Sequence, residues 1–103
     1  MTQQFLLTRL SMQIEFDPGK RRTTLAQRGL DFKRAIEVFA AASVDFIDSR
    51  VDYGEQRIFT FGKLDARYVV VIWTPRGNAR RIISMRYANA REIAQYAARV
   101  GRP

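Results

Sequence analysis

The run Tyr68-Val-Val-Val-Ile-Trp73 constrains the fold of this chain more than any other segment. It is apolar on both faces of the strand that it predicts, and such a strand belongs at the centre of a sheet. Another strand pattern, at 57–61, precedes it, and the short connection through residues 62–66 predicts that the two strands pair as an antiparallel hairpin. The sequence therefore predicts a sheet built around this hairpin.

Shorter patterns predict the remaining strands. Residues 12–16 alternate between apolar and polar side chains, which is the period of a half-buried strand. A short strand is predicted at 44–47 and is followed by a charged loop at 48–55. A turn at 75–78 leads from the central strand, predicted at 67–74, to a last strand at 80–87.

Three helices are expected around these strands. Asp17 and Pro18 are typical of a cap and a first helical position, and Gly29 of a helix stop. A second helix begins after Gly29, and its apolar stripe is formed by Phe32, Ile36 and Phe39. Asn89 and Glu92 have the spacing of a capping box at the start of the last helix. The apolar stripe of that helix is formed by Ile93, Tyr96, Ala97 and Val100.

The order of these elements predicts an α+β fold, a small antiparallel sheet of about four strands with two N-terminal helices and one C-terminal helix. We expect the helices to pack on one side of the sheet, which leaves the other face open. Residues 12–103 are expected to form a single domain, because the chain of 103 residues is long enough for one hydrophobic core. Residues 1–11 are expected to be an N-terminal extension, either disordered or not native to the domain.

Positive charge is concentrated near the C-terminus. The chain carries a formal net charge of +8. Residues 76–103 contain seven arginines and one acid, a net +6, whereas residues 1–75 carry a net +2. A cationic surface on a compact domain indicates a polyphosphate partner, because each guanidinium offers a rigid fork of donors that fits phosphate oxygens.

Two residue types are missing, and their absence excludes whole classes of chemistry. The chain has no cysteine, so disulfides, thiolate metal sites and a cysteine nucleophile are excluded. It has no histidine, which excludes the usual zinc sites and every histidine-based catalytic arrangement. No apolar run reaches the length of a membrane span and no signal peptide is recognised, so we expect a cytoplasmic location.

Short motifs in order along the chain resemble the BrnT family, the toxins of type II toxin–antitoxin pairs. The C-terminal motif consists of Arg81-Ile82-Ile83-Ser84, Arg86, Ala88 and Arg91-Glu92. The N-terminal motif consists of Ile14-Glu15-Phe16-Asp17, Lys20, Arg28-Gly29 and Phe32. The middle motif consists of Arg50, Asp52-Tyr53-Gly54-Glu55, Arg57 and Gly62. The resemblance covers nearly everything from Met12 to about Tyr96, and it is specific because the pieces occur together at the right separations.

The resemblance implies a RelE/ParE-like fold and an endoribonuclease toxin that inhibits translation. It also implies a cognate DNA-binding antitoxin, similar to BrnA, which we expect to join the toxin in a heterotetramer. Two cations that the family often carries are absent, since Tyr87 and Ala90 stand at positions where relatives have lysine. No cofactor is implied.

Cleaving RNA without a metal ion requires a base for the attacking 2′-hydroxyl, cations that stabilise the pentavalent phosphate, and an acid for the 5′-oxygen. We predict that Arg81 and Arg86 hold and neutralise the scissile phosphate and that Ser84 or Lys20 orients it. Without histidine, Glu55 or Tyr53 is the candidate proton carrier. Further cations expected to bind RNA are Lys20, Arg57, Arg76, Arg80 and Arg91.

Strict strand alternation places Ser84 and Arg86 on the open face together with Arg80 and Ile82. The core-facing pair is then Ile83 and Met85, on the side of Arg81 and Tyr87. The role of Arg81 therefore rests on the family resemblance, unless a bulge or the strand start turns its side chain.

Simpler interpretations stay open for these residues. Arg86 can be one half of a surface ion pair, and Ser84 can be a strand hydroxyl that bonds a neighbour. The segment around Tyr53 and Glu55 can be a solvated turn. The carboxylates Asp48, Asp52 and Glu55 lack the spacing of a metal-binding loop, so no metal ligand is predicted.

Two other functions are kept as alternatives. One is a non-catalytic, basic module that binds nucleic acid or the antitoxin, which the missing lysines and histidines favour. The other is a ParE-like poison of a DNA topoisomerase, which is suggested by fold kinship alone.

Overall fold

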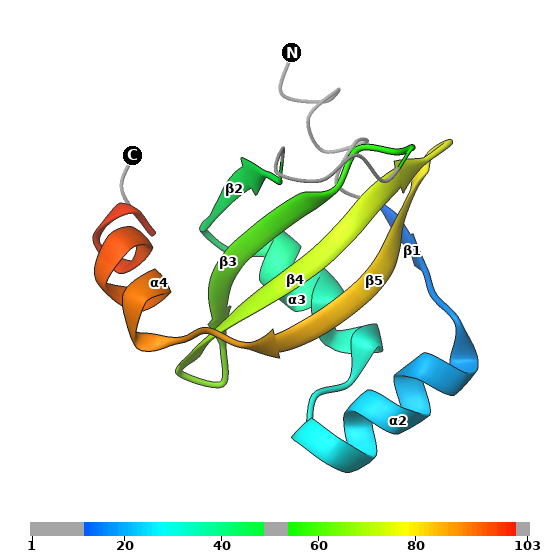
Figure 1. The fold of residues 1–103 in the computed structure, drawn as a ribbon, viewed down its shortest axis with the longest axis horizontal. Helices are drawn as coiled ribbons and strands as arrows, with labels where there is room; N and C mark the ends of the chain where they lie inside the picture. Colours follow the sequence, from blue (N-terminus) through cyan, green and yellow to red (C-terminus); the bar gives the residue numbers. More distant parts are fainter. Residues whose placement is uncertain (1–11, 49–53, 101–103) are drawn as a thin grey trace.

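The computed structural model describes residues 12–48 and 54–100. Its elements, in chain order, are β1 (Gln13–Glu15), α2 (Pro18–Arg28), η1 (Phe32–Arg34), α3 (Ala35–Ala40), β2 (Ser43–Ile47), β3 (Ile58–Leu64), β4 (Arg67–Arg76), β5 (Ala79–Tyr87), α4 (Ala90–Tyr96) and η2 (Ala97–Arg99). Figure 1 shows the strands as one twisted sheet, with α4 at one end and α2 at the other. No helix in the described ranges is long and apolar enough to cross a membrane.

The strands form one mixed sheet in the order β1-β5-β4-β3-β2. The α+β class is therefore confirmed, but the described part of the chain forms a sheet of five strands rather than about four. The additional pairing is parallel and joins β1 to the start of β5, with Gln13 opposite Ala79. Helices and three strands separate the two partners along the chain, so the alternation that predicted the first strand carried no information about its neighbour.

The prediction that the apolar run lies at the sheet centre is confirmed. β4 is the middle strand, and Val69, Val70 and Val71 are all fully buried. The strand pairs with β3 on one side and β5 on the other. Its two faces are covered by different parts of the chain.

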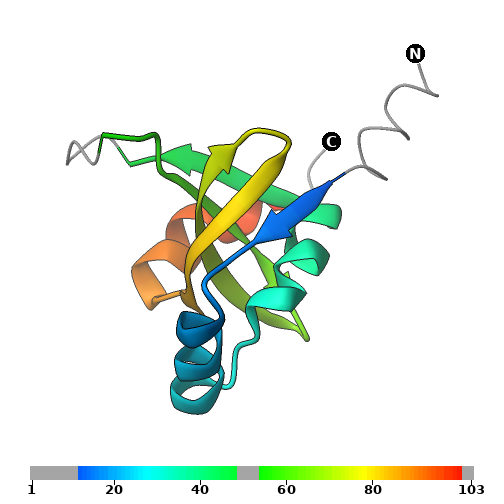
Figure 2. The same cartoon turned by 90° about the vertical axis from the view of Figure 1, so that its right-hand side faces the viewer.

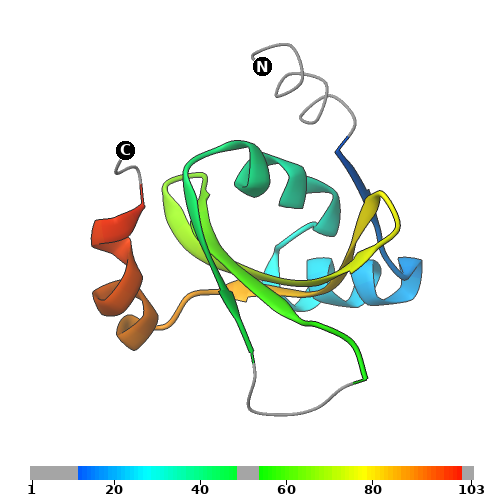
Figure 3. The same cartoon turned by 90° about the horizontal axis from the view of Figure 1, so that it is seen from above.

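One face of the sheet packs against η1 and α3 to form the main core. From the helices it receives Phe32, Ala35 and Val38, and from the strands Val69, Val71, Trp73, Ile82 and Met85. Figure 3 shows α3 lying across this side of the sheet. Trp73 is only 6% exposed, and its indole nitrogen donates to Thr60 Oγ1 at 2.8 Å.

The predicted stripe of the second helix is only partly correct. Phe32 is buried and Phe39 packs against the core, but the side chain of Ile36 is 41% exposed. The segment starts as a 3-10 turn at Phe32–Arg34 before it becomes α-helical. That tighter turn shifts the phase of the helix, so Ala35 and Val38 face the core.

We call the opposite side of the sheet, which carries Phe59, Val70, Ile72, Ser84 and Arg86, the distal face. The C-terminal helix packs on this face. Its Tyr96 ring stacks on the ring of Phe46, with the centroids 4.8 Å apart and an angle of 11° between the ring planes. Tyr96 also lies 5.6 Å from the ring of Phe61. The expectation that all helices share one side is therefore wrong. An apolar central strand requires cover on both faces, and α4 supplies it at one end (Figure 2).

The helix caps predicted from sequence are confirmed. Asp17 accepts a hydrogen bond from the Lys20 amide at 2.8 Å, Pro18 begins α2, and Gly29 ends it with φ +70°. Asn89 and Glu92 form the reciprocal capping box of α4. These ends fix where α2 and α4 start relative to the sheet.

The β3–β4 hairpin is tighter than predicted. Gly62 belongs to β3 rather than to the turn, where it pairs with Val69. Glycine suits this position because α3 passes so close that a Cβ would lie 3.0 Å from Val38 Cγ1. The connection is only the pair Asp65 and Ala66, both with positive φ, 52° and 68°. A two-residue turn of this kind suits the right-handed twist of a hairpin.

Candidate functional site

The cationic strand β5 contains a bulge that decides which side chains reach the distal face. Trp73 pairs with Ile82 and Ile72 pairs with Ser84, so Ile83 is an additional residue in the ladder. Ile82 and Met85 are therefore the core-facing residues, with exposures of 2% and 0%. The predicted core pair of Ile83 and Met85 is wrong for Ile83, because a bulge interrupts strict alternation.

The same bulge puts three of the predicted site residues on one face. Arg81 pairs with Thr74, two strand positions from Ile72, and so lies on the distal face with Ser84 and Arg86. Without the bulge, strict alternation would put Arg81 on the face opposite Ser84 and Arg86. The bulge is thus the structural feature that brings the predicted phosphate-binding arginines to the same side of β5.

Arg80 lies on the opposite side of the sheet, so the prediction that it shares a face with Ser84 and Arg86 is wrong, because the bulge at Ile83 interrupts the alternation. Its guanidinium stacks over the rings of Phe39 and Trp73, 4.4 Å from each centroid. Burial lowers the pKa of Arg80 from its usual value. This position separates Arg80 from the other predicted RNA-binding cations, next to α3 rather than on the distal face.

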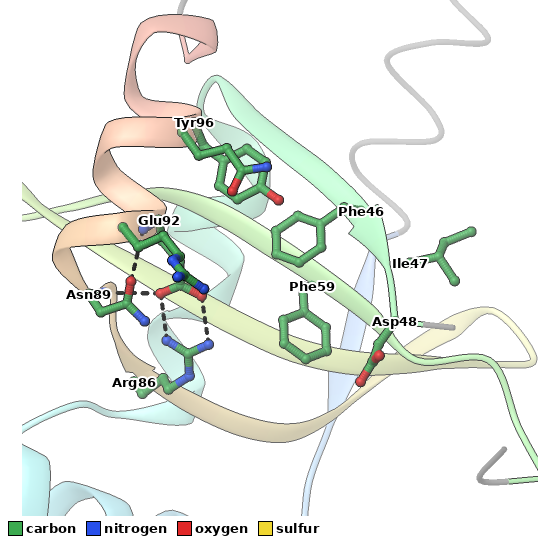
Figure 4. Close-up of a pocket in the computed structure, with 10 residues that line it drawn as sticks. Phe46, Ile47, Asp48, Phe59, Arg86, Asn89, Glu92 and Tyr96 are labelled. Atoms are coloured by element: carbon green, nitrogen blue, oxygen red, sulfur yellow. Dashed lines mark hydrogen bonds and ion pairs between the residues drawn. The ribbon is translucent and has the colours of Figure 1, made fainter. Parts of the chain in front are cut away.

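Arg86 is held by two charge-assisted hydrogen bonds. Its Nη1 and Nη2 atoms donate to the two carboxylate oxygens of Glu92, each at 2.8 Å (Figure 4). Glu92 Oε1 also accepts from the Asn89 amide at 3.0 Å, as part of the capping box. The hydrogen bonds raise the pKa of Arg86 and lower the pKa of Glu92, so both groups are charged at neutral pH. Arg86 therefore forms an ion pair, as the simpler interpretation of this residue predicted.

A pocket of about 430 Å³ lies between α4 and the distal face. Arg86 and Arg91 both line it, so the structure brings these two predicted residues together. The full lining comprises Phe46, Ile47, Asp48, Phe59, Arg86, Asn89, Arg91, Glu92, Gln95 and Tyr96. Figure 4 shows the Arg86–Glu92 pair on one side of this pocket and the phenyl rings on another.

A looser cluster of charges occupies the other end of the distal face. Arg81 Nη1 and Arg76 Nε lie 3.7 and 3.9 Å from Glu15 Oε1. Arg76 Nη2 lies 3.8 Å from Glu55 Oε1. Arg57 precedes β3, and alternation with Ile58 places it on the distal face. The structure therefore groups Glu55 with Arg76 and Arg81, rather than with Arg86.

Lys20 and Ser84 share a second pocket, of about 510 Å³, where α2 runs beside β5. Its lining comprises Asp17, Gly19, Lys20, Thr23, Thr24, Gln27, Arg28, Phe32, Ile83 and Ser84. Arg28 donates to the Met85 carbonyl at 2.9 Å and so ties the end of α2 to β5. Both residues proposed to orient the phosphate therefore border one cavity.

One predicted catalytic residue, Tyr53, lies outside the described residues, as do Arg50 and Asp52 of the family motif. Within 12–48 and 54–100, no three acidic side chains are grouped so that they could hold a metal ion.

Sequence reasoning missed three residues of this site. Glu92 was recognised only as a capping residue and as part of the family motif, although it bonds Arg86 as well. Phe46 and Phe59 form part of the pocket wall, and they pair across β2 and β3. Alternation within each predicted strand does not fix the register between the two strands, and nothing in the sequence shows that a pocket opens there.

A family model described as "Ribonuclease toxin, BrnT, of type II toxin-antitoxin system" matches residues 16–92, which is well over half of the chain. The matched range includes the whole sheet apart from β1, and it ends at the glutamate that bonds Arg86. No curated protein sequence matches the chain.

Proposed function

This chain belongs to the BrnT family of ribonuclease toxins of type II toxin–antitoxin systems, and from that premise we propose that it is an endoribonuclease that inhibits translation and needs no metal ion. Membership implies a cognate antitoxin as a partner. The observation that best supports an RNA-cleaving surface is the placement of Arg81, Ser84 and Arg86 on the distal face by the bulge in β5. We propose this face as the active site of a RelE/ParE-like toxin domain within residues 12–103, to which residues 1–11 are an extension.

The reaction that this surface suits is attack of a 2′-hydroxyl on the neighbouring phosphate. The 2′-oxygen forms a bond to phosphorus, the bond to the 5′-oxygen breaks, and a 2′,3′-cyclic phosphate and a 5′-hydroxyl result. Arg81 and Arg86 stabilise the charge on the pentavalent phosphate, and Ser84 or Lys20 orients it. Guanidinium groups suit this role because they stay charged at any working pH.

A base must take the proton from the 2′-hydroxyl, and an acid must give one to the 5′-oxygen. Glu55 or Tyr53 is our candidate for this proton transfer. The position of Glu55 supports the assignment. Its Oε1 atom lies 3.8 Å from Arg76 Nη2, at the end of the distal face where Arg81 lies. With no histidine in the chain, charge stabilisation and substrate positioning have to supply much of the rate.

A second candidate function is a module that binds RNA or the antitoxin without cleaving RNA. The bidentate contact of Arg86 with Glu92 favours it, because the donors that would hold the scissile phosphate already have a carboxylate partner. The tyrosine and alanine at positions 87 and 90, where relatives often carry lysine, point the same way.

We further propose that a BrnA-like, DNA-binding antitoxin covers the distal face and places an acidic or apolar segment over Ser84, Arg86 and Arg91. Without such a cover, a protein with a net charge of +8 would bind cellular RNA indiscriminately. A dimeric antitoxin of this kind would bring two toxins together in a heterotetramer.

The decisive experiment is cleavage of RNA by purified protein in the presence of EDTA. We expect products with 2′,3′-cyclic phosphate ends, no cleavage when the RNA carries 2′-deoxy sugars, and protection when the antitoxin is added. A matched preparation with both Arg81 and Arg86 changed to alanine controls for contaminating nucleases. Intact RNA after incubation with the folded wild-type protein would instead support the non-catalytic module.

A further inference from the structure

The pocket between α4 and the distal face has a wall of aromatic rings. The centroids of Phe46 and Phe59 lie 5.1 Å apart, and Phe46 also stacks on Tyr96 at 4.8 Å. All three side chains are partly exposed rather than buried, so part of each ring surface is open to a ligand. An aromatic patch therefore lies in a pocket whose charged lining consists of Arg86, Arg91, Asp48 and Glu92.

Cations border this patch. Arg86 forms one wall of the pocket, and Arg91 is exposed in the first turn of α4 at another. The pocket adjoins the proposed phosphate-binding residues of β5, because Arg86 lines the pocket and lies two residues from Ser84 on the same face. A ligand in the pocket would therefore present an aromatic surface to the rings and negative charge to the flanking arginines.

We propose that this pocket binds one unstacked nucleobase of single-stranded RNA, beside a phosphate held by Arg86. The proposal rests on the proposed function, and it adds a base-recognition site to the phosphate-binding surface. RNA alternates aromatic bases with phosphates along one chain, which is the combination that the rings and arginines require. The volume of about 430 Å³ lies within the range of roughly 300–1,000 Å³ found for small-molecule sites.

The form of RNA follows from the same geometry. Bases inside a duplex are stacked and paired, so a ring wall set between a helix and a sheet is reached only by a splayed, single-stranded base. The wall that would contact the base is formed by aromatic rings, which favours stacking over strict readout of one base. We therefore expect a preference for unpaired positions and for bases that stack strongly.

A test that does not depend on cleavage is binding of a short, unstructured oligoribonucleotide with 2′-O-methyl groups, which lacks the attacking hydroxyl. Phe59→Leu removes the ring but keeps an apolar side chain, and we expect it to weaken binding by about fivefold or more. Phe59→Tyr restores a ring and should bind within about twofold of wild type. Phe39→Leu, on the α3 side of the sheet next to Trp73, is the matched control for loss of a phenyl ring and should bind as wild type does.

A second arm compares two probes on the wild-type protein, so that its main result stays informative if a variant fails to fold. An oligonucleotide with abasic positions should bind at least about fivefold more weakly than the complete one, and Phe59→Leu should be insensitive to that change. Equal affinity for the complete and abasic probes would overturn the base pocket. So would a Phe59→Leu protein that keeps its RNA affinity but loses the antitoxin, because the pocket would then be an anchor site for protein. Base-dependent binding without any cleavage would keep the pocket and reject the proposed enzyme.

Discussion

Arg86 donates to both carboxylate oxygens of Glu92, so a phosphate that binds Arg86 has to compete with a partner already in place. Glu92 is also the third residue of α4 and accepts the Asn89 amide in the capping box. One carboxylate thus orients the proposed catalytic arginine and starts the helix that forms the pocket. Substrate binding at Arg86 is therefore coupled to the position of α4.

Replacing Arg86 by alanine should lower the cleavage rate by about 10²-fold or more, as expected when a preorganised charge stabiliser is removed. Glu55→Gln should reduce the rate less, because charge stabilisation carries more of the rate than proton transfer. Initial rates on a defined RNA measure both effects, with Arg67→Ala as a control. Arg67 lies 3.6 Å from the centroid of the Tyr87 ring, on the other face of the sheet. Full activity in Arg86→Ala combined with none in folded Glu55→Gln would reject the electrostatic account.

Glu92→Gln should free Arg86 for phosphate and tighten RNA binding several-fold, while it destabilises the protein by about 1 kcal/mol near neutral pH. The pKa of Glu92 is lowered, chiefly by the Arg86 hydrogen bonds. A lowered folded-state pKa gives stability that is present above the ordinary glutamate pKa and is lost as pH falls through the folded value. Wild type and Glu92→Gln should therefore converge in Tm under acid conditions. A gap that is the same at neutral and acid pH would argue against the ion pair as its cause.

Among the elements, the β3–β4 hairpin offers the clearest gain in stability. Ala66 has φ +68°, a left-handed conformation that is unfavourable for a residue with a Cβ. Ala66→Gly should raise the free energy of unfolding by about 0.5–1 kcal/mol, after the larger entropy of glycine in the unfolded chain is subtracted. Chemical denaturation measures this, and Ala40→Gly at the end of α3 should change stability in the opposite direction. Asp65 is best left unchanged, because it accepts hydrogen bonds from Arg34.

Helix α2 has no buried residue, so its position depends on polar contacts. Arg21 donates to both oxygens of Asp31 at 2.7 and 2.9 Å, and this contact lowers the pKa of Asp31 to about 2. Asp31→Asn should cost about 1 kcal/mol or less at neutral pH, since the pair is partly exposed. The difference should be present above the ordinary aspartate pKa and vanish as pH falls through about 2. Tm measured across the acid range would show it, and a difference that grows toward low pH would contradict it.

Local signals in the sequence predicted those elements whose causes are themselves local. The caps at Asp17 and Asn89, the stop at Gly29 and the buried run of β4 each depend on neighbouring residues, and all four are confirmed. The parallel pairing of β1, the packing of α4 on the distal face and the bulge at Ile83 depend on contacts between distant segments. Alternation cannot reveal them.

The site shows the same division. The resemblance to the BrnT family selected Arg81 in spite of strict alternation, and the bulge puts that residue on the face of Ser84 and Arg86. No local signal separated Arg80 from these residues, since the bulge at Ile83 puts it on the opposite face, where it stacks on Phe39 and Trp73. The aromatic pocket needed α4 to be placed on the sheet before it could be recognised.

At the scale of the whole molecule, the distribution of charge predicts how RNA binding responds to salt. The distal face and the adjoining turn of α4 carry Arg57, Arg76, Arg81, Arg86 and Arg91, by strand alternation and by the lining of the pocket. If these groups contact phosphates of a single strand, log K should fall with log salt with a slope near −0.7 per contact, or about −3.5 for all of them. Arg86→Ala should make the slope shallower by about 0.7, whereas Arg67→Ala on the other face should leave it unchanged. An antitoxin that covers the distal face should abolish this salt-dependent binding altogether. Titrations of non-cleavable RNA at several salt concentrations measure each slope, and a slope equally sensitive to both substitutions would mean that RNA binds the whole basic surface and not one face.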